Sequence, residues 1–275
     1  MQSTIAQALA SSRLDAVDAR VLLRHACGCD DAFLVAHTDD KLSPAQSAQY
    51  AALVARRAAG EPVAYIVGTR EFFSLDFKVT PAVLIPRPET ELLVEFALDR
   101  IAADRAAGVL DLGTGSGCIA IAIARHRPCA RVVAVDRSAA ALAVARENSV
   151  RHRVANLELR QSDWFSNLGV ERFDLIVANP PYVAAHDPHL QSGDLRAEPL
   201  GALSAGEDGL ECLRAIAAAA PAHLNNGGVI AVEHGYDQAP RCRELLKAAG
   251  LEEVFSRTDI AGIARVSGGV WLGQC

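Results

Sequence analysis

The chain has 275 residues, of which 51% are hydrophobic and 22% are charged, a balance typical of globular proteins and not of disordered ones. This length accommodates one large domain, or a large domain and a small one. The formal net charge of −6 weighs against nucleic acid as a direct partner, because phosphate binding usually requires a basic surface.

Targeting signals and cysteine usage point to one compartment. No basic region followed by an apolar one opens the chain, and no charge-free apolar run reaches membrane-spanning length. The seven cysteines are scattered and form no Cys-x-x-Cys pair, as expected of small hydrophobic residues in a reduced compartment. His186 and His189 have the spacing of metal ligands but lack a third ligand nearby. We therefore expect a cytoplasmic protein with no membrane partner and no metal.

The first part of the chain has the patterning of helices. Asp15 and Asp18 resemble a capping box at the start of an apolar helical run, which Gly28 ends. Ser43-Pro44 opens another helix, predicted to end near Gly60.

The periodicity changes between Glu71 and Val79, where apolar and polar residues alternate as in a half-exposed strand. Thr80-Pro81 is predicted to turn the chain and Val83-Leu84-Ile85 to return it, which makes a β-hairpin. From Pro88 onward, helical stretches alternate with short apolar strands. This alternation predicts a mostly parallel sheet with helices on both faces.

A glycine-rich loop follows the first of these strands. Val109-Leu110-Asp111-Leu112 leads directly into Gly113-Thr114-Gly115-Ser116-Gly117, and the helical run Cys118–Ala124 comes next. Glycines let a ligand approach the backbone, and the N–H groups at a helix start face it. The order predicts a nucleotide-type site. No P-loop sequence occurs, so a P-loop NTPase is not expected.

The next predicted strand ends in Asp136, about 20 residues past the loop, an offset that suits a ribose diol. Cys118 stands where the strict dinucleotide pattern needs a third glycine, although a relaxed pattern survives. Glycine spacing alone therefore leaves a dinucleotide open. Asp111 weighs against it, because an acid inside the turn suits a cationic ligand better than a pyrophosphate.

The strand Leu157–Arg160 runs into Gln161 and then Ser162-Asp163-Trp164. Trp164 offers a flat apolar face and Asp163 an acceptor, a combination that suits an adenine ring. Taken alone, Trp164 is explained equally well as a core residue.

The apolar run Phe173–Ala178 is typical of a buried parallel strand, and Asn179-Pro180-Pro181-Tyr182 follows it. Two prolines cannot continue a sheet ladder, so the chain must turn at the carboxyl end of the strand, where open α/β sheets bind ligands. The Asn179 side-chain carbonyl and the Pro180 backbone carbonyl can accept from a planar amide or amine, on which Tyr182 can stack. A proline turn capped by Asn would be the first interpretation of the tetrapeptide alone. The upstream glycine loop shifts the balance to ligand binding.

In this order, the glycine loop, Asp136, Ser162-Asp163-Trp164 and Asn-Pro-Pro-Tyr resemble the Rossmann-like S-adenosylmethionine-dependent methyltransferases. Gly60–Gly68 and the Pro-Arg-Pro-Glu-Thr-Glu block at 86–91 are similar to the protein-(glutamine-N5) methyltransferases of peptide-chain release factors. Further similar segments are Phe72-Phe73, Glu198-Pro199-Leu200, Asp208-Gly209-Leu210, Glu233-His234-Gly235 and Asp259-Ile260-Ala261-Gly262.

The resemblance implies an α/β fold with a class I methyltransferase sheet, mostly parallel, and a small N-terminal helical domain joined to it by a β-hairpin. Residues 1–68 would form the helical substrate-recognition domain, 69–87 the hairpin linker and 88–275 the methyltransferase domain. The reaction implied is methyl transfer from S-adenosyl-L-methionine, leaving S-adenosyl-L-homocysteine, to the glutamine nitrogen of the Gly-Gly-Gln sequence in class 1 release factors. We expect a monomer that needs no metal.

The resemblance also assigns the site residues. Those expected to bind the cofactor are Asp111, Gly113, Thr114, Gly115, Ser116, Gly117, Asp136, Asp163, Trp164 and Asn179. Those expected to bind the substrate amide are Asn179, Pro180, Pro181 and Tyr182, and the first, second and last of these are expected to be catalytic. No side chain is an evident general base.

Three alternatives stay open. The first is a glutamine methyltransferase of a large-subunit ribosomal protein, which only the Pro-Arg-Pro-Glu-Thr-Glu block and the linker disfavour. The second is an adenine-N6 methyltransferase that uses the same tetrapeptide on a flipped base of DNA or RNA. The net charge argues against it, because Arg56-Arg57 and Arg151-His152-Arg153 are better explained as solvated helix faces. The third is a noncatalytic binding module of the same fold.

Overall fold

The computed structural model describes residues 3–273, which divide into two compact units. One unit contains residues 3–69 together with Ser192–Ala197, and the other contains Arg70–Gln191 and residues 198–273. The chain therefore passes from one unit to the other after Thr69, Gln191 and Ala197.

The first unit is helical. Its elements are α1 (Ile5–Ser11), α2 (Ala16–Cys27), α3 (Asp31–Ala36), α4 (Pro44–Ala58), α5 (Val63–Val67) and the 3₁₀ turn η3 (Gly193–Ala197). The predicted ends of the helices are confirmed: Gly28 ends α2 in the left-handed conformation, and Ser43 forms a reciprocal capping box with Gln46 at the start of α4. The predicted capping box at Asp15 and Asp18 is wrong in part. Asp15 accepts from the Val17 N–H, whereas the Asp18 carboxylate accepts from the Arg57 side chain.

The β-hairpin is present, but the predicted position of its turn is wrong. The two strands are β1 (Thr69–Phe72) and β2 (Leu75–Lys78), and residues 83–85 form no strand. The turn lies at Phe73 and Ser74, which both have positive φ, at 51° and 58°. Glutamate side chains hold it, because Glu91 accepts from the Phe73 N–H at 2.8 Å and Glu71 from the Ser74 N–H at 2.6 Å. Such turns usually carry Asn or Gly, so the sequence lacked the usual signal.

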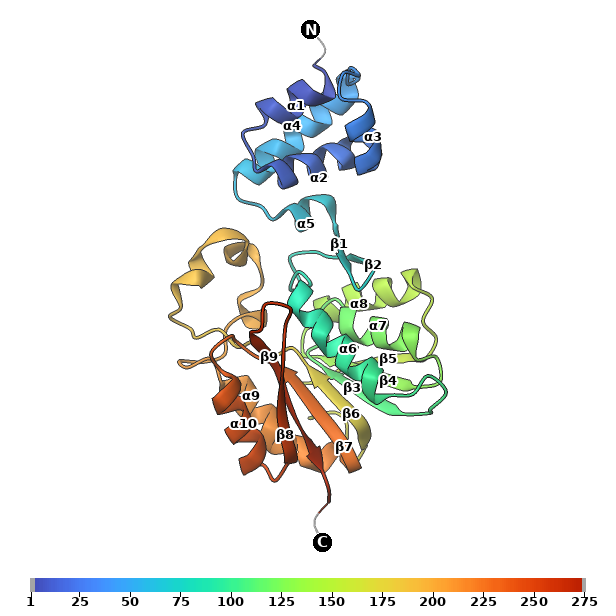
Figure 1. Cartoon of the computed structure of the whole chain (residues 1–275), viewed down its shortest axis with the longest axis vertical. Coiled ribbons are helices and arrows are strands. Elements are labelled where there is room, and N and C mark those ends of the chain that lie inside the picture. Colours follow the sequence, from blue (N-terminus) through green and yellow to red (C-terminus); the bar gives the residue numbers. More distant parts are fainter. Residues whose placement is uncertain (1–2, 274–275) are drawn as a thin grey trace. The chain divides into compact units, whose positions relative to one another are not determined.

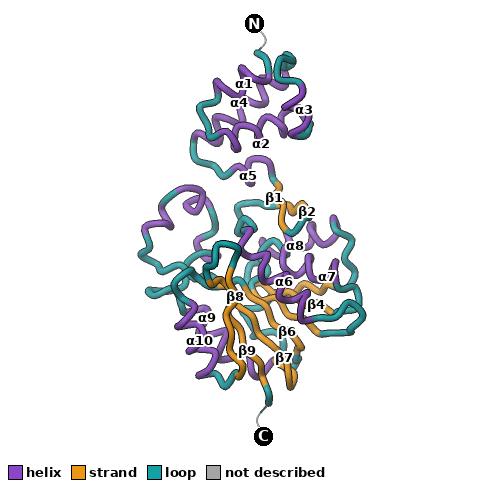
Figure 2. The backbone as a smooth tube through the Cα atoms, viewed as in Figure 1, coloured by secondary structure: helices purple, strands orange, loops and turns teal. Residues whose placement is uncertain are grey.

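The second unit is built on a sheet that contains seven strands within the described residues (Figures 1 and 2). Its order is β5-β4-β3-β6-β7-β9-β8, in which β3 to β7 are parallel and β9 is antiparallel to both neighbours. The strands are β3 (Gly108–Leu112), β4 (Arg131–Asp136), β5 (Leu157–Gln161), β6 (Phe173–Ala178), β7 (Leu224–Glu233), β8 (Glu252–Thr258) and β9 (Ala264–Trp271). The mostly parallel sheet predicted from the alternation of elements is thus confirmed.

Helices cover both faces of this sheet (Figure 1). On one face lie α6 (Glu91–Arg100), α7 (Cys118–His126) and α8 (Ala139–Arg151), and on the other lie α9 (Glu211–Ala219) and α10 (Ala239–Ala248). Short 3₁₀ turns complete the unit: η1 (Pro88–Thr90), η2 (Pro188–Gln191), η4 (Leu200–Ala202) and η5 (Ala220–His223). Strand side chains alternate between the two cores, as Val109 and Leu110 illustrate.

The strands β3 and β6 are neighbours whose following segments diverge. The chain after β3 leads through α7 to β4 on one side, while the chain after β6 leads toward β7 on the other. Such a switch point at the carboxyl edge is where open α/β sheets bind ligands. Leu112 pairs with Ala178 in register. The glycine loop and Asn179 therefore leave the sheet at the same level, side by side.

Candidate active site

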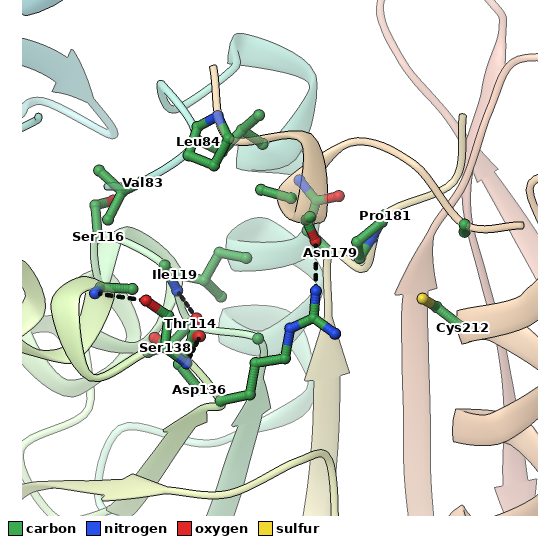
Figure 3. A pocket seen from close by; sticks show the side chains of 18 of the residues that line it. Val83, Leu84, Thr114, Ser116, Ile119, Asp136, Ser138, Asn179, Pro181 and Cys212 are labelled. Atoms are coloured by element: carbon green, nitrogen blue, oxygen red, sulfur yellow. Dashed lines mark hydrogen bonds between the residues drawn. The ribbon is translucent and has the colours of Figure 1, made fainter. Parts of the chain in front are cut away.

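A cavity of about 440 Å³ lies at this edge of the sheet (Figure 3). The predicted site residues that line it are Gly113, Thr114, Gly115, Ser116, Asp136, Asp163, Trp164, Asn179 and Pro181. Asp136 and Ser138 lie on one side of the cavity, and Asn179 and Pro181 lie on the other. The structure thus brings together residues from the ends of four strands.

The glycine loop has a backbone that side chains would not allow. Gly113, Gly115 and Gly117 have φ values of 70°, 55° and 82°, in the left-handed region that favours glycine. A Cβ atom on Gly113 would lie 3.3 Å from the Trp164 ring, and one on Gly117 would lie 3.2 Å from Ala145 Cβ. Gly113 thus permits close approach to the tryptophan at the cavity, whereas Gly117 does not line the cavity and permits packing of α7 on α8.

Asp136 organises the loop through both carboxylate oxygens. Oδ2 accepts from the Gly115 N–H at 2.9 Å, and Oδ1 accepts from the Ser138 N–H at 2.8 Å. Ser138 in turn caps α8 by accepting from the Ala141 N–H at 3.1 Å. A carboxylate has about four acceptor positions, so Asp136 can still accept from hydroxyl groups of a ligand.

Trp164 and Asp163 both line the cavity beyond the end of β5. Trp164 is half-buried and packs partly against the core on the α9 and α10 face. Its φ of 47° is unusual for a bulky residue and turns the chain sharply toward the loop. The core interpretation and the ligand interpretation of Trp164 are therefore compatible.

Asp111 does not line the cavity, which separates it from the other predicted cofactor-binding residues. It is fully buried beneath the loop, and its Oδ2 accepts from the Thr114 hydroxyl at 2.6 Å. Within the described part of the chain, Oδ1 has no hydrogen-bond partner. Burial raises the pKa of Asp111 to about 7. Direct contact between this carboxylate and a ligand stays a prediction.

The Asn-Pro-Pro-Tyr turn is anchored at both ends. Asn179 Nδ2 donates to the Thr90 hydroxyl at 2.9 Å, and the Tyr182 hydroxyl donates to Glu233 Oε1 at 3.2 Å. Burial, followed by the nearby Glu233, raises the pKa of Tyr182, so its hydroxyl stays protonated and can donate. Pro180 is buried, and neither Pro180 nor Tyr182 lines the cavity. Their contacts with a substrate amide stay predictions.

Four residues support the site although the sequence predicts no role for them: Thr90, Glu233, Arg87 and Glu198. Glu198 is buried, pairs with Arg87 and accepts from the Ile85 N–H at 3.0 Å, so it joins the segments on two sides of the cavity. The sequence does contain a clue to Glu233, because this carboxyl group directly follows the apolar strand residues 229–232. These residues occurred only in segments quoted for their resemblance.

Residues 3–273 contain neither a candidate metal cluster nor a helix that could span a membrane. No group of three or more His, Cys, Asp and Glu side chains is arranged to hold a metal ion there. Nor is any helix of that range long and apolar enough to cross a bilayer.

Comparisons with known proteins agree with this geometry. Residues 2–68 match the family model of the PrmC N-terminal domain, and residues 88–194 match that of the methyltransferase small domain. The chain is 54% identical over 273 residues to the release factor glutamine methyltransferase of Burkholderia pseudomallei, covering 97% of this chain and 96% of that protein. The chain belongs to the release factor glutamine methyltransferase family. A relative of the same name from Pseudomonas aeruginosa is 47% identical, with 93% and 92% covered.

The predicted family is thus confirmed, and with it a methyltransferase type that depends on S-adenosylmethionine. A methyltransferase structure from Pyrococcus furiosus has a TM-score of 0.55, with 21% identity and 80% of this chain and 98% of that chain covered. At this identity it shows the fold alone. The predicted class I sheet with an N-terminal helical region and a hairpin is confirmed.

The cavity fits S-adenosylmethionine. Its lining combines the exposed backbone of the glycine loop, the acceptor carboxylate of Asp136 and the flat face of Trp164, which are groups that a ribose diol and an adenine ring can contact. The unpaired buried oxygen of Asp111 beneath the loop also suits a ligand that carries positive charge.

Proposed function

We propose that the protein transfers a methyl group from S-adenosylmethionine to the glutamine side-chain nitrogen in the Gly-Gly-Gln sequence of class 1 release factors. The observation that carries the proposal is the position of Asn179, which lines the same cavity as the glycine loop and leaves the sheet beside it. The names of the relatives support the release factor as the substrate.

The cofactor would be held by the loop backbone, by Asp136 at the ribose and by Trp164 and Asp163 at the adenine. When bound, S-adenosylmethionine supplies a methyl group that its sulfonium has already activated. The task left to the protein is to prepare the nucleophile.

An amide nitrogen is a poor nucleophile because its lone pair is delocalised into the carbonyl. Asn179 donates its own N–H to Thr90, so its Oδ1 is left to accept from the substrate amide. The Pro180 carbonyl would accept the second N–H hydrogen. Two fixed acceptors orient the nitrogen and favour its pyramidal form, so positioning and preorganised dipoles supply most of the acceleration. The methylated nitrogen is strongly acidic, and its proton passes to water.

Residues 1–68 would recognise the body of the release factor and not take part in the chemistry. This region has its own hydrophobic core and matches a family model separate from that of the methyltransferase domain. The proposed substrate takes part in translation, which places the reaction in the cytoplasm.

In the decisive assay, the enzyme is incubated with labelled S-adenosylmethionine and, in separate reactions, with a class 1 release factor, a large-subunit ribosomal protein or duplex DNA. We expect label in the release factor only, located by mass spectrometry on the glutamine of Gly-Gly-Gln. A release factor with that glutamine replaced by alanine is the matched control. Label in this control, in the ribosomal protein alone or in DNA would contradict the proposal.

A further inference from the structure

A chain of polar side chains runs from the cavity wall into the interior of the second unit. Asn179 contacts Thr90, and Tyr182 contacts Glu233. Thr90 and Glu233 are each only 2% exposed. The Thr90 hydroxyl also interacts with the Glu233 carboxyl and favours its ionised form. Both ends of the Asn-Pro-Pro-Tyr turn are therefore linked to one buried carboxyl group.

This arrangement bears on the orientation of the Asn179 amide, which has two nearly isosteric positions. A carboxylate can only accept hydrogen bonds, so the interaction of Thr90 with an ionised Glu233 requires the single Thr90 hydrogen to point toward that carboxylate. The Thr90 oxygen is then left to accept from Asn179 Nδ2. This order directs the Asn179 carbonyl oxygen away from Thr90, where it can accept from a substrate. The reverse orientation would present an N–H2 group to the substrate N–H2 group.

Glu233 has the acceptor capacity that this role requires. Its Oε1 accepts from Tyr182, while Oε2 is buried and has no full hydrogen bond within the described residues. A glutamine in its place would keep one acceptor oxygen but replace the other with a donor N–H2 group, so a donor that faces this second position would lose its acceptor.

We propose that Glu233 is a positioning residue which, through Thr90 and Tyr182, orients Asn179 and holds the Asn-Pro-Pro-Tyr turn for the substrate amide. The proposal rests on the proposed function, because it assigns Asn179 to the substrate. Glu233 itself does not line the cavity.

The charge of Glu233 depends on the groups that surround it. Burial raises its pKa to about 7, and Glu89 in η1 adds to the rise, while Thr90, Tyr182 and Arg265 in β9 oppose it. Cys118 at the start of α7 is also close enough to interact, but its own pKa is raised to about 12, so it stays neutral. His234, the first residue after β7, interacts with the Ser267 hydroxyl at 2.8 Å, and burial lowers its pKa. Glu233 thus changes its charge near pH 7, and the orientation of the Asn179 amide should change with that charge.

The test measures single-turnover methylation of a release factor at saturating cofactor and substrate. Thr90→Val keeps the shape but removes the hydroxyl, and we expect a rate loss of up to about 100-fold, the cost of misplacing a reacting group by about 1 Å. Thr90→Ser should restore most of the rate. Cofactor affinity, measured by calorimetry, should stay at the wild-type value in both variants, which also shows that they are folded.

The pH profile separates this role from a merely structural one. The wild-type rate should fall as the pH drops through about 7, because protonation of Glu233 removes the acceptor for Thr90. Glu233→Gln should be slow throughout and lack this step, whereas Glu244→Gln, at an exposed glutamate on α10, should behave as the wild type.

A wild-type rate in Thr90→Val would overturn the proposal, as would an unchanged pH step in Glu233→Gln. If Glu233→Gln does not fold, the methylation rates of Thr90→Val and Thr90→Ser decide whether the positioning role holds. A wild-type enzyme that leaves the release factor unmethylated would contradict the proposed function. If the wild type methylates the release factor and Thr90→Val and Glu233→Gln do so at the same rate, only the positioning role is contradicted.

Discussion

At the scale of single residues, the site combines acceptor oxygens with backbone that glycine leaves bare. Asn179 is the residue to which the proposed function assigns the chemistry, because it lines the cavity while its N–H2 group is already bound to Thr90. Asp136 differs from it, since both its oxygens hold the loop. In the proposed function, Asn179 therefore serves catalysis and Asp136 serves cofactor binding.

Replacing Asn179 by alanine should lower methyl transfer by about two to three orders of magnitude, the effect of deleting one preorganised hydrogen bond. Cofactor affinity should be nearly unchanged, because the loop, Asp136 and Trp164 carry most of that contact. Asn179→Asp keeps an acceptor oxygen but adds a charge, so its rate should lie between the two. Rate measurements with calorimetry check this. An Asn179→Ala enzyme of normal rate would refute the role.

The buried Asp111 should make stability depend on pH. Its folded pKa of about 7 lies above its ordinary value of 3.8. The folded state therefore binds the proton more tightly, and its stabilisation is complete below the ordinary pKa and is lost as the pH rises to about 7. Between pH 5 and pH 8 this one group should lower the free energy of unfolding by about 3 kcal/mol.

Asp111→Asn cannot titrate, so its free energy of unfolding should change less between these two pH values. Urea unfolding at pH 5 and pH 8 gives the comparison. Glu233 contributes in the same direction in both proteins. Equal pH dependence in wild type and variant would show that Asp111 keeps its ordinary pKa.

At the scale of elements, the hairpin shows how a turn forms without its usual residues. Phe73 and Ser74 adopt left-handed conformations that glycine adopts more easily, and the carboxylates of Glu91 and Glu71 accept from their N–H groups. The turn is thus supported by one side chain from β1 and one from the start of α6, at some conformational cost.

Ser74→Gly should relieve that cost and raise the free energy of unfolding by about 0.5–1 kcal/mol, less than the full left-handed penalty because glycine also gains freedom in the unfolded chain. Ser74→Ala, which has no easier access to positive φ, should not stabilise. Chemical denaturation measures both. A destabilised glycine variant would mean that the serine side chain supports the turn.

At the scale of the whole molecule, a segment from the catalytic half of the sequence belongs to the helical unit. Ser192–Ala197 packs with residues 3–69, where Asp194 pairs with Arg57 at 2.6 Å and Arg57 also binds Asp18 at 2.7 Å. Gly60 has a φ of 93°, and the Arg196 guanidinium lies against its Cα. The helical unit is therefore completed by the loop that follows Asn-Pro-Pro-Tyr.

Deleting residues 1–68 should preserve cofactor binding, since none of the described residues 3–68 lines the cavity. Methylation of an intact release factor should fall sharply, because its docking surface is lost. Arg57→Ala, which frees Asp194 within the helical unit, should give a weaker effect of the same kind. Cofactor calorimetry and methylation kinetics test this, and a truncated enzyme with the full rate would refute the division of labour.

Local patterns in the sequence were enough to predict the strands that end at the cavity. Short strand patterns predicted β3 to β6, and the residues at or just after their ends predicted Gly113–Gly117, Asp136, Trp164 and Asn179 as site residues. All of these except Gly117 line the cavity. These predictions needed only the rule that parallel strands end at a common edge. The family resemblance supplied the reaction, and the sheet order then placed Asn179 beside the loop.

Contacts between distant segments were decided by the tertiary structure alone. The sequence separates Thr90 from Asn179 by 89 residues and Tyr182 from Glu233 by 51, and no periodicity relates them. The same holds for the Glu91 carboxylate that supports the hairpin turn and for Asp194 in the helical unit. A local pattern reports which side chains are apolar, whereas the partner of a buried polar group is set by which segments the folded core brings together.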